Sequence, residues 1–177
     1  MRVVLKPHPE TPCSAITAFD CEVEREGGRL SLCWHLEGAA TRIVLPEPRA
    51  AGRAEGLWRA TCFEAFVKPF GGDAYTELNA SPSGRWASYD FDDYRAGMID
   101  AEAVTAGPID LGGSDRRLIL KTTFDGLASE AAWSVAISAV IELDDGDKSY
   151  WALAHAPGKP GFHHPDGFVL DLPADRS

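Results

Sequence analysis

Basic side chains are scarce in this sequence. Its 177 residues hold 17 Lys and Arg against 27 Asp and Glu, which gives a formal net charge of −10. Proteins bind nucleic acids through Lys and Arg that neutralise phosphates, so the charge balance argues against a nucleic-acid partner. Anionic membrane surfaces attract basic segments for the same reason, and we therefore expect no adsorption to a membrane.

Long apolar runs are also lacking. The apolar run near the start covers only residues 3–5, whereas the core of a secretory signal needs about 7–15 residues. The longest apolar stretch lies near Trp133–Ile141 and is interrupted by Ser134 and Ser138. A membrane-spanning helix needs about 20 apolar residues, so we expect a soluble, cytoplasmic protein.

The sequence contains no motif typical of a metal site or a nucleophile. Its four cysteines include no C-x-x-C pair, so we expect free thiols in a reducing compartment. His155, His163 and His164 lie close together in sequence, but neighbours on an extended chain point in opposite directions and do not easily bind one ion. Neither G-x-S-x-G nor G-x-G-x-x-G occurs. We predict no catalytic residues, no metal and no cofactor.

No segment has a long 3.6-residue period. Apolar residues instead alternate with polar ones, a pattern typical of half-buried strands, and Gly and Pro separate the segments. This pattern predicts an all-β antiparallel sandwich in one domain, residues 1–177. The segment 49–56 reads as a loop, 92–117 as a loop with one weak strand, and 125–132 as one or two helical turns. Strands are expected at residues 19–24, 30–36, 42–45, 61–67, 74–80, 85–91, 118–124, 133–143, 150–154 and 168–172.

Alternation divides the five tryptophans into two groups. Trp34 and Trp133 share strand faces with Leu, Ile and Val, so we assign them to the core. Trp58, Trp86 and Trp151 lie at strand ends or beside polar residues. An indole ring can pack on the C–H face of a sugar, so these three are candidate ligand contacts. The alternative is that they fill the ends of the sandwich.

Two strand carboxylates are candidates for the polar part of a site. Glu64 stands between Phe63 and Phe66 in an apolar strand, where a charge requires a partner. On the next strand, Glu77 and Asn79 share one face, and a hairpin would bring that face next to Glu64. Such a cluster suits a polyhydroxylated ligand; the alternative is a solvated outer face. Glu64 and Glu77 could also serve as the carboxylate pair of a glycosidase.

Several segments together resemble a known family. The central block reads LWRATCFEAF at residues 57–66 and YTELNASPSGRWASYDF at residues 75–91. The chain opens with LKPHP at 5–9 and closes with YWALAH at 150–155, followed by FH at 162–163. These blocks, spread over nearly the whole chain, resemble the bacterial DOMON-like proteins. Their relatives include the family 9 carbohydrate-binding modules and the haem- or sugar-binding DOMON domains, all of which are β-sandwiches.

The resemblance implies a sugar clamp. Family 9 modules hold a terminal sugar ring between two Trp, with Glu, Arg and Asn beneath it. Trp58 precedes Glu64 by a similar interval here, and Asn79 matches the family's Asn, whereas Glu77 stands where the family has Arg. The second clamp residue would be Trp151, Phe162 or His163. Haem-binding DOMON domains use Met and His as axial ligands, and Met98 would be the methionine here.

We therefore expect a non-catalytic protein that binds a small carbohydrate or sugar derivative in an aromatic-lined cleft. The alternatives are a haem-binding domain, an enzyme or accessory subunit acting on sugars through Glu64 or His155, and a protein-interaction domain. The sequence carries no signal for the oligomeric state. The predicted ligand-binding residues are Trp58, Glu64, Glu77, Asn79, Trp86, Trp151, His155, Phe162 and His163.

Overall fold

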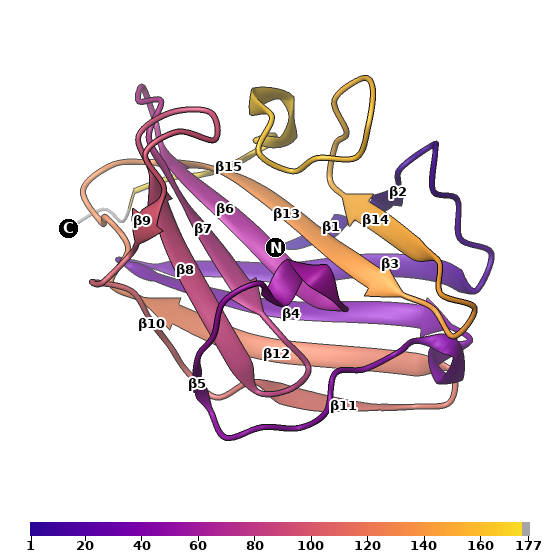
Figure 1. Cartoon of the computed structure of the whole chain (residues 1–177). Helices are drawn as coiled ribbons and strands as arrows, with labels where there is room; N and C mark the ends of the chain where they lie inside the picture. Colours follow the sequence, from indigo (N-terminus) through magenta and orange to yellow (C-terminus); the bar gives the residue numbers. More distant parts are fainter. Residues whose placement is uncertain (175–177) are drawn as a thin grey trace.

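Two antiparallel sheets pack face to face in the computed structural model, as Figure 1 shows. The structure describes residues 1–174; the predicted domain runs to 177, and its last three residues lie outside the described part. The first sheet has the order β1-β3-β4-β12-β10, with β11 also paired to β12. Its strands are β1 (Arg2–Val4), β3 (Ile16–Glu26), β4 (Arg29–Gly38), β10 (Thr105–Ala106), β11 (Asp110–Ser114) and β12 (Arg117–Asp125).

The second sheet carries the features discussed below. Its order is β2-β14-β13-β6-β7-β8-β5, with β15 paired to β13 and β9 to β8. Only β5 pairs in parallel within the described chain, along β8. The strands are β2 (Lys6–Pro7), β5 (Gly52–Arg53), β6 (Cys62–Pro69), β7 (Tyr75–Ala80), β8 (Arg85–Phe91), β9 (Ile99–Asp100), β13 (Trp133–Glu142), β14 (Lys148–Ala152) and β15 (Leu170–Leu172). The predicted all-β sandwich is confirmed.

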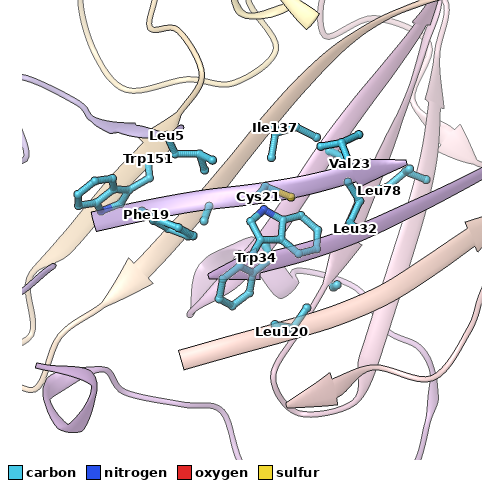
Figure 2. Packing of buried hydrophobic residues seen from close by; sticks show 14 of the residues in the cluster. Leu5, Phe19, Cys21, Val23, Leu32, Trp34, Leu78, Leu120, Ile137 and Trp151 are labelled. Atoms are coloured by element: carbon cyan, nitrogen blue, oxygen red, sulfur yellow. The ribbon is translucent and has the colours of Figure 1, made fainter. Parts of the chain in front are cut away.

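The core lies between the sheets and follows the predicted alternation. Trp34 and Trp133 are fully buried there, as predicted. Figure 2 shows Trp34 surrounded by leucines and other apolar side chains of both sheets. All four cysteines are free.

Trp151 corrects one predicted ligand contact. It is only 4% exposed and belongs to the core, where its ring lies 5.5 Å from that of Phe19 (Figure 2). The short strand β2 pairs with β14 and places Pro7 opposite Trp151. Because side chains alternate along a strand, Tyr150 points to the other face of the sheet in its place.

Several boundaries differ from the predicted ones. The expected strand at 42–45 is instead a 3-10 turn, η1 (Ala40–Arg42), followed by an isolated bridge from Ile43 to Leu143. The segment 49–56, read as a loop, contains β5, and 92–117, read as a loop with one weak strand, contains β9, β10 and β11. These strands are mostly two residues long, too short to show alternation. At the C-terminal end, β14 ends at Ala152 and β15 begins only at Leu170.

The helical turns expected at 125–132 are absent from that described segment. Gly126 has φ +88°, and a Cβ there would lie 2.0 Å from the carbonyl oxygen of Ala103. The next amide, of Leu127, donates to the carbonyl of Gly28 in the hairpin between β3 and β4. The backbone of this segment thus bonds to its neighbour instead of to itself.

Candidate functional site

The outer face of the second sheet carries a second aromatic cluster. It combines Phe66, Tyr75, Tyr89 and Phe91 from β6, β7 and β8, and Leu57, Phe162 and Phe168 from the covering segments pack against it. These covering segments include the 3-10 turn η2 (Leu57–Arg59) and the loop after β14, which holds η3 (Pro165–Gly167). These segments cover the apolar outer face of the sheet and leave a pocket between them.

The pocket has a volume of about 370 Å³. Ligand pockets typically range over about 300–1,000 Å³, so the space suits a small molecule. It opens between η2, the loop after β8 and the loop after β14. Its lining consists of Trp58, Glu64, Glu77, Phe91, Arg95, Met98, Val140, Tyr150, Pro160, Gly161, Phe162 and His163.

A row of polar side chains crosses the sheet beneath the pocket. Ser138 on β13 lies opposite Glu64 on β6, and Glu64 lies opposite Asn79 on β7. All three are almost fully buried, with Glu64 3% exposed. Within residues 1–174, Glu64 Oε1 and Ser138 Oγ have no hydrogen-bond partner. Buried polar atoms without a partner are rare, and Glu64 also lines the pocket, so its Oε1 is a candidate for contact with a ligand.

Asn79 holds the second carboxyl in place. Its side-chain amide donates to Glu77 Oε1 over 2.7 Å, and its Oδ1 lies 3.7 Å from the Cys62 thiol. The Asn79 amide is thus fully buried and hydrogen-bonded within the sheet. It positions Glu77, which faces the pocket, and it is not itself part of the lining.

Burial shifts the pKa of both carboxyls upward. The pKa of Glu64 is raised well above its usual value, first by burial and then by the nearby Glu77 carboxylate. The pKa of Glu77 is also raised by burial, while the Asn79 amide and the charge of Arg95 act in the opposite direction. Glu64 therefore keeps its proton to a higher pH than an ordinary glutamate, and a protonated carboxyl both donates and accepts a hydrogen bond.

His163 closes one side of the pocket as a neutral ring. Burial, helped by Arg95, lowers its pKa to about 4. Its Nδ1 is 2.8 Å from the Tyr75 hydroxyl, which accepts from the Arg95 backbone amide at 3.2 Å. The Tyr75 hydroxyl can then donate a hydrogen bond to Nδ1. In that tautomer the ring carries its hydrogen on Nε2, which lies 3.6 Å from Glu77 Oε2. This chain of contacts fixes the imidazole orientation.

Arg95 reaches the pocket from a tight turn in the loop after β8. Its φ of +53° lies in the left-handed region, which non-glycine residues seldom adopt. The turn is closed by the bridge between Asp93 and Ala96. The guanidinium lies beside Gly161, where a Cβ would meet Nη2 at 3.3 Å. Backbone strain of this kind is often found at ligand sites.

Aromatic rings form the sides of the pocket. Trp58 on η2 is 38% exposed and meets Tyr89 edge to face at 6.0 Å. Across the lining, the rings of Tyr150 and Phe162 lie 6.0 Å apart. An exposed indole edge and a pair of rings above buried polar groups can contact both the apolar faces and the hydroxyls of one small ligand.

Five of the nine predicted site residues line this one pocket. They are Trp58, Glu64, Glu77, Phe162 and His163. Asn79 lies beneath it, as described above.

The other three lie elsewhere. Trp86 packs on the core under Arg53, whose guanidinium is 4.3 Å from its ring. Trp151 is a core residue. His155 contacts His8 ring to ring at 4.9 Å, and its Nε2 bonds to the carbonyl of Lys6. Both Trp86 and Trp151 alternate onto the inner face, which the sequence pattern at the ends of their strands obscured.

Sequence reasoning missed several lining residues. Tyr150 was detectable, because it must face opposite to Trp151 on the same strand. Phe91 was detectable too, as it shares the face of Glu77 through the register of β7 and β8. Arg95, Met98 and Pro160 lie in irregular loops, and no periodic pattern marks their direction.

A haem ligand pair was one alternative, and Met98 and His163 do line the same pocket. The residues do not fit that group. The two ring nitrogens of His163 face Tyr75 and Glu77, so neither is presented to an iron. The pocket floor also carries two buried carboxyls.

No helix in the part of the chain described here is long and apolar enough to cross a membrane.

Comparison with solved structures gives the fold independent support. A candidate carbohydrate-binding protein from Bacteroides uniformis superposes with a TM-score of 0.61 at 15% identity, over 94% of this chain and 84% of that one. A family 9 carbohydrate-binding module from Caldicellulosiruptor kristjanssonii, solved with cellotriose, has a TM-score of 0.49 at 9% identity, over 93% and 80%. No protein-family model and no curated protein sequence matches the chain. At these identities the chain shares with the first structure a β-sandwich fold.

Proposed function

We propose that this protein binds a small carbohydrate or sugar derivative in the pocket on the outer face of the second sheet, without catalysing a reaction. The observation that carries the proposal is the buried, unpaired Glu64 Oε1 in a pocket walled by aromatic rings. A purely apolar ligand would leave that oxygen without a partner, at a cost of about 1–3 kcal/mol. A polyhydroxylated ligand supplies partners.

Each lining group has a role in this proposal. Trp58 packs against the C–H face of a sugar ring. The second aromatic contact comes from Phe162, one of the three predicted candidates, or from Tyr150 on the strand of Trp151. Glu64 and Glu77 bind hydroxyl groups. Arg95 supplies the cationic donor that the family 9 pattern has at the position of Glu77. Arg95 in the loop thus provides the positive charge that β7 lacks at Glu77, and this supports sugar binding.

The finer assignments belong to the same proposal. We propose that the chain is a bacterial DOMON-like protein that acts in the cytoplasm. The sequence blocks at residues 57–66 and 75–91 support the first part. The short apolar runs and the free cysteines support the second.

The test is a calorimetric screen of neutral, amino and acidic sugars against the full chain. The proposal expects at least one saturable ligand, whose binding is lost in Trp58→Ala. Phe70→Ala is a matched control, since Phe70 is an exposed ring outside the pocket. A screen without a ligand, or a ligand that binds Trp58→Ala as well as the wild type, would sink the proposal.

One observation favours an enzyme as the second candidate. Carboxyl groups with raised pKa values in a pocket are typical of general acids, and Glu64 and Glu77 both meet that description. A glycosidase would hydrolyse aryl glycosides, and Glu64→Gln would abolish turnover while leaving binding. A binding protein shows no turnover, and the same substitution weakens binding instead.

A further inference from the structure

A group of three potential metal ligands lies on the opposite side of the molecule, on the outer face of the first sheet. Cys33 and His35 are two residues apart on β4, so both side chains point away from the core. Glu22 on β3 is the direct cross-strand partner of Cys33. One ligand atom from each residue lies within 4.8 Å of the other two.

Two of the three donor separations match the edges of a tetrahedron around a zinc ion, and the third is within 4.8 Å. Cys33 Sγ lies 3.3 Å from His35 Nε2, and Glu22 Oε1 lies 3.6 Å from the same nitrogen. Zinc binds sulfur at about 2.3 Å and nitrogen or oxygen at about 2.0–2.2 Å, so tetrahedral angles separate these donors by about 3.3–3.6 Å. A metal could therefore be bound with little movement of the side chains.

A nucleophilic triad is the competing interpretation, and the geometry argues against it. In such a triad the carboxylate binds one ring nitrogen and the nucleophile the other. Here the Cys33 thiol and the Glu22 carboxylate both meet Nε2 of His35. Burial and the Glu22 charge also raise the pKa of the Cys33 thiol, whereas a reactive thiol has a lowered pKa. The three donor atoms thus lie close together, as ligands of one ion would.

The surrounding charges are balanced. Arg2 is bound by Asp20 through hydrogen bonds of 2.7 and 2.9 Å, and its Nη1 also lies 3.8 Å from Glu22 Oε1. Asp20 is the cross-strand partner of His35, and Lys121 on β12 is that of Cys33. The two cations near the thiol are thus matched by Asp20 and Glu22, and loss of the thiol proton on metal binding would add a further negative charge.

We propose that Glu22, Cys33 and His35 form a binding site for a divalent transition-metal ion, with zinc as the best fit. Thiolate and imidazole ligands favour zinc over calcium and magnesium, which prefer oxygen. Binding deprotonates Cys33 and leaves a fourth coordination position for water or for a donor atom of another molecule. The site does not depend on the sugar pocket, from which the whole thickness of the sandwich separates it.

The test is a titration of the reduced, tag-free full chain with Co²⁺, followed by displacement with Zn²⁺. The proposal predicts one ion per chain and a thiolate-to-cobalt absorption band that Zn²⁺ abolishes. Cys33→Ser removes the band. Cys13→Ser, which removes another half-buried thiol outside the cluster, leaves it unchanged.

Two further variants keep the test decisive if Cys33→Ser does not fold. Glu22→Gln and His35→Ala retain the thiol and each remove one ligand. Each should weaken Zn²⁺ binding at least as much as the roughly 10–100-fold that loss of an outer-shell partner costs. Absence of saturable binding in the wild type, a band that persists in Cys33→Ser, or unchanged affinity in both of these variants would overturn the proposal.

Discussion

Glu64 on β6 and Ser138 on β13 lie directly opposite each other, and within residues 1–174 neither Glu64 Oε1 nor Ser138 Oγ has a hydrogen-bond partner. Two buried polar atoms without a partner, on adjacent strands, reduce stability, because each has lost its hydrogen bonds to water. Glu64 lies under an open pocket, where an unpaired oxygen can bind a ligand. A bound hydroxyl group can reach Glu64 Oε1, because Glu64 lines the pocket.

The raised pKa of Glu64 predicts a specific effect of pH on stability. The folded protein holds the Glu64 proton to a higher pH than the unfolded chain does. Between about pH 4.3 and the folded pKa of Glu64, the unfolded chain therefore binds fewer protons than the folded protein. The unfolding free energy falls as pH rises through this window. Glu64→Gln should therefore be more stable than the wild type at neutral pH, and the gain should vanish at low pH.

Denaturant unfolding at several pH values checks this prediction. Glu102→Gln is the matched control, since Glu102 is exposed and away from the pocket. It should leave the pH profile of the wild type unchanged. If Glu64→Gln were less stable than the wild type at every pH, the Glu64 carboxyl would have a stabilising partner and the account of the pocket floor would be wrong.

Two tryptophans should respond in opposite ways to removal. Trp151 is buried against Phe19, so Trp151→Ala should lower the unfolding free energy by about 3–5 kcal/mol. Trp58 is partly exposed, and Trp58→Ala should cost about 1 kcal/mol or less. Among variants that fold, Trp58→Ala should weaken ligand binding more than Trp151→Ala does. Equal losses of stability in thermal unfolding would contradict this division between core and site.

The strained turn at Arg95 provides a third prediction. Asn tolerates the left-handed conformation better than Arg, so Arg95→Asn should fold with unchanged or slightly higher stability. It removes the guanidinium from the pocket, and affinity for the ligand should fall. A large loss of stability with intact affinity would mean that Arg95 serves the fold and not the site.

His163 should titrate far from an ordinary histidine. Its pKa of about 4 means that the folded state binds fewer protons than the unfolded chain between about pH 6.5 and 4. This residue's contribution to stability is therefore lost as pH falls through that window. An NMR titration should show one imidazole with a midpoint near 4, and His163→Gln should remove that signal. A midpoint near 6.5 would disprove the buried, neutral ring.

The sequence predicts the sandwich well because alternation encodes which face of a strand is buried. Trp34 and Trp133 could be assigned to the core on that basis alone. Glu64 stood out for another reason, since a carboxylate flanked by Phe63 and Phe66 in an apolar strand requires a partner.

Other parts of the site lie beyond such reasoning. Arg95 enters the pocket through a left-handed turn in an irregular loop, and alternation says nothing about such segments. Trp151 was misassigned because β14 is short and its inner face is completed by β2, a two-residue strand from the far end of the chain. Loop direction and long-range pairing depend on tertiary contacts that local sequence does not carry.

The central claim is that Glu64 Oε1 receives a hydroxyl group of a bound sugar. The most direct measurement is a crystal structure of the complex with a sugar from the calorimetric screen. The account predicts a ring packed on Trp58 with one hydroxyl oxygen about 2.5–3.0 Å from Glu64 Oε1. A sugar bound out of reach of Glu64, or at another surface of the protein, would contradict it.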